Sequence, residues 1–186
     1  MLYDKDIREP LCNYMEDTYG KIRCFDEIVI AKARADIMAV RPGEIIGVEI
    51  KSNADTYARL KSQVANYNKF CDRNYVVVGL RHLVHVAEHI PNFWGIICIY
   101  EDNRQIIVEE KREALANPKL RFKFQMSLLW KRELHNILDR NHLPKYRQKS
   151  KNFIIDKLME KIPEAQLKEE LCQELFERDY SIFAEE

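Results

Sequence analysis

The sequence predicts an α/β fold, in which helices cover a central mixed sheet. Residues 34–40 and 44–51 alternate as the two strands of a hairpin, and residues 74–80 form the continuous apolar run that is typical of a buried parallel strand. A helix predicted at residues 56–72, with Asp55 as its N-cap, connects the hairpin to this strand. Strands this apolar need helices on the sheet faces, so we expect about five strands between helical layers.

The N-terminal part of the chain supplies a further helix and a further strand. Residues 3–18 have the apolar spacing of an amphipathic helix. Pro10 lies inside this pattern, so the helix is expected to kink there or to begin later, and Gly20 suits its C-terminal end. Residues 25–31 are expected to form a strand that precedes the hairpin.

Two more strands and a helix with histidines follow. Residues 94–100 are expected to form a buried strand, and residues 105–108 return as a hairpin. Residues 81–89 are expected to form a helix with three histidines on roughly one side: His82, His85 and His89. Both a metal cluster and a hydrated helix edge are open for these histidines. The hydrated edge is favoured because no carboxylate or cysteine stands at zincin-like spacing.

The character of the chain changes near residue 114, where helical patterns replace strands. Helices are expected in three segments: 122–139, 151–160 and 165–178. Ser150 is a suitable N-cap for the second of them. We therefore divide the chain into a core at residues 1–112 and a helical C-terminal extension at residues 113–186. The extension is loosely similar to SAP-like DNA-binding modules, and packing on the sheet or a dimer contact is an equally open role.

Three polar residues stand inside the apolar hairpin: Asp36, Glu49 and Lys51. Glu49 and Lys51 share one strand face by period two, and pairing of the two strands can bring Asp36 alongside them. Two carboxylates and an ammonium in a buried hairpin are costly unless they are compensated. A divalent cation is one compensation, and oxygen ligands of this kind suit Mg²⁺ or Mn²⁺. A surface hairpin with solvated charges is disfavoured because both strands are too apolar.

These residues resemble the D…(D/E)-X-K signature of the PD-(D/E)XK nuclease superfamily. Asp36 stands at the first acid, and Glu49-Ile50-Lys51 at the second part of the signature. Ala35 stands where the superfamily usually has proline, at a position that varies widely within it. Gln63 and Tyr67 match the Q-x-x-x-Y element of RecB-like members. The surrounding sequence also resembles small bacterial members, including the MmcB-like DNA-repair group.

The resemblance, which covers roughly residues 5–100, implies a restriction-endonuclease-like core with the element order α-β-β-β-α-β. It implies a metal-dependent nuclease that hydrolyses phosphodiester bonds, of DNA in preference to RNA, in repair, recombination or phage defence. Asp36 and Glu49 would bind Mg²⁺ or Mn²⁺ together with the main-chain carbonyl of Ile50. Lys51 would orient or deprotonate the attacking water.

Four more residues are candidates for the same site. Gln63 is expected to hold the attacking water, a phosphate or a ligand carboxylate, whereas Tyr67 could do the same or only pack. Arg34 shares the strand face of Asp36 and could contact a phosphate or pair with a carboxylate. Glu27 resembles a further acid that related nucleases supply, although a solvent-facing glutamate is the favoured interpretation.

The charges of the chain balance overall but are unevenly distributed. The net charge is zero, with 30 basic and 30 acidic residues, so composition alone does not indicate nucleic-acid binding. Residues 111–151, however, contain twelve Lys or Arg against three Asp or Glu. Such a basic block beside an acidic site suits a phosphate backbone. A solvated helix surface is an equally open interpretation.

Other classes of protein are disfavoured. No apolar run is long enough to cross a membrane, and residues 1–11 lack a signal-peptide pattern, so we expect a cytoplasmic protein without a membrane partner. The five cysteines are scattered and form no C-x-x-C. This pattern favours buried free thiols over a zinc site, an iron–sulfur cluster or a disulfide framework.

Two alternatives to catalysis stay open on the sequence. The chain could be a nuclease-fold module that binds DNA or a protein partner without cutting, although the intact set of Asp36, Glu49 and Lys51 argues against it. It could also be a regulatory interaction protein of phage or defence origin, whose mark would be an exposed apolar patch. The sequence does not decide whether the protein forms a homodimer.

Overall fold

The computed structural model describes residues 2–30 and 33–180. Within them, six strands form one sheet in chain order, where about five were expected: β1 (Arg23–Ile30), β2 (Ala33–Arg41), β3 (Glu44–Lys51), β4 (Arg73–Val78), β5 (Gly95–Asp102) and β6 (Gln105–Arg112). β4 pairs in parallel with β3 and β5, and the other neighbours are antiparallel. The predicted mixed α/β sheet is therefore confirmed.

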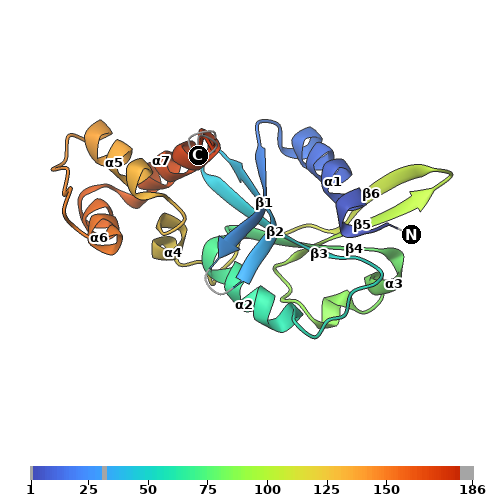
Figure 1. Ribbon diagram of the computed structural model, residues 1–186. Helices are drawn as coiled ribbons and strands as arrows, with labels where there is room; N and C mark the ends of the chain where they lie inside the picture. Colours follow the sequence, from blue (N-terminus) through green and yellow to red (C-terminus); the bar gives the residue numbers. More distant parts are fainter. Residues whose placement is uncertain (1, 31–32, 181–186) are drawn as a thin grey trace, which may run out of the picture.

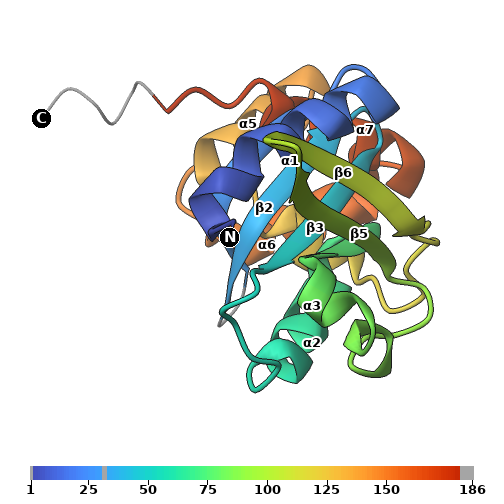
Figure 2. The same ribbon diagram turned by 90° about the vertical axis from the view of Figure 1, so that its right-hand side faces the viewer.

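Helix α1 (Asp4–Tyr19) covers one face of the sheet (Figures 1 and 2). Three of its side chains are buried in the cluster on that face: Ile7, Leu11 and Met15. The helix begins close to the predicted position and continues through Pro10. It ends at Gly20, whose φ of 72° is a conformation that glycine adopts readily.

Helix α2 (Leu60–Phe70) packs on the opposite face of the sheet (Figure 1). It begins later than the predicted residue 56, and the prediction that Asp55 caps it is wrong. The carboxylate of Asp55 instead accepts hydrogen bonds from the backbone N and the Oγ of Ser52, at 2.8 and 2.7 Å. This local turn uses the oxygen that an N-cap would need, so the helix starts further along the chain.

The segment between β4 and β5 is not the single helix predicted at residues 81–89. It consists of the short helix α3 (Leu80–Leu83) and a 3-10 turn, η1 (Val86–Glu88). The hydroxyl of Tyr57 donates to the backbone carbonyl of His82 at 2.9 Å. In a continued helix, this carbonyl would accept the hydrogen bond from the next turn. His82 is buried, whereas the other two histidines are exposed, so the three do not share one hydrated side.

Four helices of the C-terminal extension gather at one end of the molecule, opposite the β5–β6 hairpin (Figure 1): α4 (Phe122–Met126), α5 (Lys131–Arg140), α6 (Lys151–Lys161) and α7 (Glu164–Phe176). The helical segment expected at 122–139 is thus divided between α4 and α5. Ser150 caps α6 as predicted, by accepting a hydrogen bond from the backbone N–H of Phe153 at 3.2 Å. The extension and one sheet face share a single hydrophobic cluster. The boundary between residues 112 and 113 stays a prediction.

Two further sequence features can be located in the structure. Among the described residues, no helix is both long and apolar enough to cross a membrane. The five cysteines are free thiols, and the prediction that they are buried is confirmed for three of them. Cys71, Cys98 and Cys172 are buried, whereas Cys12 and Cys24 are partly exposed.

Asp72, which follows α2, connects the sheet to the C-terminal extension. Its Oδ2 accepts hydrogen bonds from the backbone N–H of Ile45 at 2.7 Å, from the amide of Gln125 at 2.9 Å and from the ammonium of Lys168 at 2.6 Å. These donors belong to β3, α4 and α7. One carboxylate therefore joins three elements that lie far apart in the sequence.

We expect Asp72→Ala to lower the free energy of unfolding by about 1–3 kcal/mol, because it leaves donors of β3, α4 and α7 without their shared acceptor. Urea denaturation followed by circular dichroism measures the change. Asp139→Ala is the matched control, since Asp139 forms an exposed pair with Lys145 at 3.2 Å. This control should cost less than about 1 kcal/mol. Equal effects of the two substitutions would contradict the bridging role of Asp72.

Candidate functional site

Strands β2 and β3 separate beside Asp36, and this separation creates the site. Their antiparallel pairing runs from Arg41↔Glu44 to Ile37↔Val48. Beyond the last pair, the backbone N–H of Ile50 donates to the carboxylate Oδ2 of Asp36 at 2.8 Å. A side chain thus takes the place of a ladder partner, and Asp36 is held against β3 while its backbone diverges.

Glu49 and Lys51 lie on the face of β3 that looks toward α2. The alternation of the strand sends Ile46, Val48 and Ile50 into the cluster under α1, which leaves the odd-numbered residues on the other face. Glu49 is fully buried and Lys51 is 4% exposed. The ammonium Nζ of Lys51 lies 2.5 Å from Oε1 of Glu49. The second oxygen, Oε2, is buried without a hydrogen-bond partner among the described residues.

The two acids influence each other's protonation. Burial, together with the nearby charge of Asp36, raises the pKa of Glu49 to about 7, and the ammonium of Lys51 opposes both effects. Burial also raises the pKa of Asp36, against the hydrogen bond from the Ile50 N–H. Where little water reaches them, it is unfavourable for two neighbouring carboxylates to carry a negative charge at the same time. A cation at this point would relieve that repulsion.

The residues present fit a divalent cation with oxygen ligands. Glu49 offers a buried oxygen without a donor, and Asp36 lies close enough to raise its pKa. In the part of the chain that the structure describes, no three His, Cys, Asp or Glu side chains gather as a metal site. A cation here would therefore take two carboxylates and complete its shell with main-chain, water or substrate oxygens, as Mg²⁺ commonly does.

Tyr67 of α2 braces the separated strands from within the core. Its hydroxyl accepts a hydrogen bond from the backbone N–H of Asp36 and donates to the carbonyl of Val48, both at 2.9 Å. The side chain is fully buried. Gly47 allows the ring to come this close, since a Cβ at that position would lie 2.5 Å from Tyr67 Cδ1. Of the two roles open for Tyr67, the geometry supports packing.

An open hollow of about 460 Å³ lies beside Asp36, between the start of β2 and the N-terminal part of α2. Its wall includes Arg34, Asp36, Arg59, Ser62 and Gln63. The side-chain oxygen Oε1 of Gln63 is buried without a hydrogen-bond partner among the described residues. We call this space the Asp36 hollow. Arg59 and Ser62 are additional members that the superfamily signature does not mark, although Arg59 precedes Gln63 by one helical turn.

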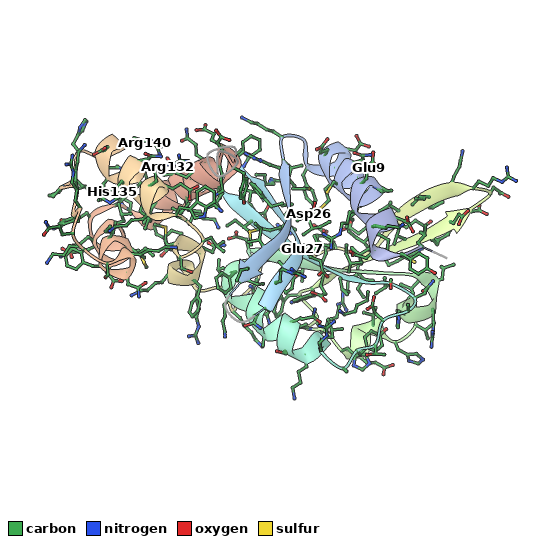
Figure 3. All side chains as sticks on the ribbon, in the orientation of Figure 1. Glu9, Asp26, Glu27, Arg132, His135 and Arg140 are labelled. Atoms are coloured by element: carbon green, nitrogen blue, oxygen red, sulfur yellow. The ribbon has the colours of Figure 1, made fainter. Side chains whose placement is uncertain are left out.

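Arg34 and Glu27 pair with each other at the exposed edge of the sheet. Glu27 lies opposite Asp36 in the register of β1 and β2, between Asp26↔Ile37 and Ile28↔Ala35, and has a φ of 56°. Its carboxylate is 3.2 Å from the guanidinium of Arg34, and both side chains are more than half exposed. Figure 3 labels Glu27 on β1. Arg34 thus pairs with a carboxylate, which is one of the two roles that the sequence left open for it, and Glu27 faces solvent.

Arg8 of α1 contacts the site from the opposite face, and local sequence patterns did not indicate it. Its Nη1 donates to the backbone carbonyl of Asp36 and to Asp26 Oδ1, both at 2.7 Å. A second pair with Asp4 at 2.8 Å holds the guanidinium in place. The backbone of Asp36 is therefore fixed from both sides of the sheet, by Arg8 and Tyr67.

The raised pKa of Glu49 predicts a pH dependence of stability. The folded-state pKa of about 7 exceeds the ordinary 4.5, so the group stabilises the fold fully below about pH 4.5 and loses this contribution by about pH 7. The loss is on the order of 3 kcal/mol. We expect Glu49→Gln to flatten this slope in urea denaturation series across that range. The exposed Glu113→Gln is the control, and an unchanged slope in Glu49→Gln would refute the assignment.

The comparisons with known proteins concern the chain as a whole. It matches the family model of Bacteriophage P4 protein cII over residues 2–184. No curated protein and no solved structure matches it. The family match spans the sheet, the candidate site and the C-terminal helices alike. The chain belongs to the bacteriophage P4 protein cII family.

Proposed function

We propose that this protein is a metal-dependent nuclease that hydrolyses phosphodiester bonds, with DNA as the preferred substrate. The observation that carries the proposal is the grouping of Asp36, Glu49 and Lys51. Asp36 lines the Asp36 hollow, and Glu49, paired with Lys51, keeps a buried oxygen without a hydrogen-bond partner among the described residues. The element order α1-β1-β2-β3-α2-β4 supports it, because a restriction-endonuclease-like core has the order α-β-β-β-α-β.

The proposed cofactor is Mg²⁺ or Mn²⁺, held by Asp36, Glu49 and the carbonyl of Ile50. When bound, the cation would stabilise the negative charge that grows on the phosphate in the transition state. Glu49 would bind the cation as a charged carboxylate, the form that burial alone disfavours. Oδ2 of Asp36 accepts the hydrogen bond from the Ile50 N–H, so we assign the other oxygen, Oδ1, to the cation.

Lys51 is the residue that we assign to the attacking water. Its Nζ is held at the separation of the strands by Glu49. In the charged form Nζ would orient the water by donating a hydrogen bond, and in the neutral form it would accept the water's proton. Gln63 Oε1 has no donor among the described residues, so it would accept a hydrogen bond from the same water. Arg59 in the Asp36 hollow would neutralise a phosphate oxygen.

We expect Mn²⁺ to bind at this site and to raise the midpoint of thermal unfolding above pH 7, where Glu49 is charged, because a ligand of the folded state stabilises it. Isothermal titration calorimetry gives the affinity, and thermal denaturation gives the shift. Asp36→Asn and Glu49→Gln should each lose both signals, whereas Asp139→Asn should keep them. Unchanged Mn²⁺ binding in both site variants would rule out this metal site.

Cleavage is the central test. Purified protein is mixed with linear duplex, single-stranded, branched and circular DNA, and with RNA, in Mg²⁺, Mn²⁺ or EDTA. We expect cutting only with metal, and a loss of at least about 10²-fold in rate for Lys51→Ala and Asp36→Ala, because each removes a group that acts on the reacting atoms. Lys145→Ala and Asp139→Ala, at an exposed pair outside the site, are the matched controls.

Two outcomes of the cleavage assay would count against the proposal. Folded protein that cuts nothing, with equal DNA binding by wild type and site variants, would favour a nuclease-fold module that binds without cutting. Folded protein that neither cuts nor binds nucleic acid would favour a protein partner. Circular dichroism and urea denaturation of every variant separate both outcomes from a failure to fold.

A further inference from the structure

A second, larger cavity lies on another side of α2. This cleft of about 510 Å³ is formed by α2, Pro91 and the turn at residues 118–121. Its wall includes four cations and no Asp or Glu: Lys61, Lys69, Lys119 and Arg121. We call it the α2 cleft. We propose that the α2 cleft binds the phosphate backbone of a nucleic-acid strand that continues to the Asp36 hollow. This inference rests on the proposed function and adds the substrate path to it.

Among the described residues, no carboxylate neutralises the cations of the α2 cleft, although Lys69 Nζ also lies 5.8 Å from the centre of the Phe124 ring. Within the described ranges, none of the four forms an ion pair with a carboxylate, although the chain has as many acids as bases. By contrast, Arg140 pairs with Glu170 and Glu174, at 3.1 and 2.5 Å. Unpaired cations around a concave surface focus a positive potential there. A chain of phosphates is the ligand that such a surface attracts.

The wall of the α2 cleft is held in position by hydrogen bonds. The side-chain amide of Asn117 donates to the carbonyls of Asn68 and Cys71 at the end of α2, at 2.9 and 2.7 Å. The backbone N–H of Arg121 donates to the carbonyl of Lys69 at 3.2 Å. The turn that carries Lys119 and Arg121 is therefore fixed to α2, so these cations are organised before any ligand arrives.

The α2 cleft and the Asp36 hollow flank the same helix. Ser62 and Gln63 line the hollow, while Lys61, Ala65 and Lys69 line the cleft. The exposed ridge of α2 that runs from the hollow to the cleft carries the short side chains of Ser62, in the hollow wall, and Ala65, in the cleft wall, which let a backbone pass close to the helix. With side chains a helix is about 10 Å wide, a distance that about three nucleotides of one strand span. A single strand could thus contact both cavities at once.

This path uses only part of the basic block that the sequence indicates at residues 111–151. Lys119 and Arg121 belong to it, but Lys61 and Lys69 come from α2. Other members lie elsewhere: Figure 3 labels Arg132 and Arg140 on α5, well away from Glu27 at the site. The cleft is thus assembled by the fold from two segments, and the remaining bases of the block are not part of it.

The test is the binding of fluorescein-labelled single-stranded and duplex DNA, measured by fluorescence anisotropy in EDTA at several salt concentrations. We expect Lys61→Ala/Lys119→Ala to weaken binding by about tenfold or more and to reduce the slope of log affinity against log salt by about 1.4–1.8. Arg147→Ala/Lys149→Ala removes the same charge from the loop before α6 and should change little. Ala65→Leu, which keeps every charge but obstructs the ridge, should also weaken binding.

The outcomes distinguish this inference from the proposed nuclease function. If wild type cuts DNA but the cleft variants bind it as wild type does, the proposal that the cleft binds DNA is wrong and the proposed nuclease activity is supported. If nothing is cut but the cleft double variant alone loses affinity, the cleft stands without the nuclease. Equal losses in both double variants, or displacement of the DNA by poly-glutamate at equal charge concentration, would overturn the cleft as a nucleic-acid site. Urea denaturation confirms that each variant is folded.

Discussion

The hydrogen bond from the backbone of Ile50 to the carboxylate of Asp36 is the contact on which the candidate site depends. At 2.8 Å it stands where a ladder bond would otherwise join β2 to β3. It fixes Asp36 against the strand that carries Glu49 and Lys51 without closing the sheet over them. Had the ladder continued, the backbone of β2 would cover this edge of β3, and no hollow could open beside the acids.

The separation of the two strands leaves backbone groups that helices must satisfy. The hydroxyl of Tyr67 in α2 accepts a hydrogen bond from the N–H of Asp36 and donates one to the carbonyl of Val48. Arg8 of α1 donates to the carbonyl of Asp36. These side chains come from opposite faces of the sheet, so both helical layers are needed to hold the gap open. Inside it, Glu49 keeps a raised pKa and an unpartnered oxygen. A group this unfavourable persists only where the surrounding structure is rigid, and it is the kind of perturbed residue that functional sites contain.

Periodicity explains why part of this site could be predicted from the sequence. Alternation placed both strands of the hairpin close to their observed bounds, and it placed Glu49 and Lys51 on one face with Asp36 nearby. What could not be predicted depends on contacts between distant segments. Arg8 lies 28 residues from Asp36, and nothing in the pattern of α1 distinguishes it from a solvated arginine. Likewise, the bond between Asp55 and Ser52 competes with a cap that the local pattern favours equally, and only the folded chain decides between them.

Net charge is a weak guide to the proposed nucleic-acid partner, because it sums charges that lie far apart on the molecule. A phosphate responds to charges within a Debye length, about 10 Å at 0.1 M salt, and not to the sum over the molecule. Among the described residues, Arg140 of α5 is neutralised by Glu170 and Glu174 of α7, and Arg178 by Glu133 of α5 at 2.6 Å, whereas the cations of the α2 cleft are in no ion pair. Helix α2 therefore lies between the candidate site with its acids and the α2 cleft with its cations. One side supplies Gln63 and Tyr67 to the acids, and the other presents cations to solvent, so the orientation of this one helix sets both.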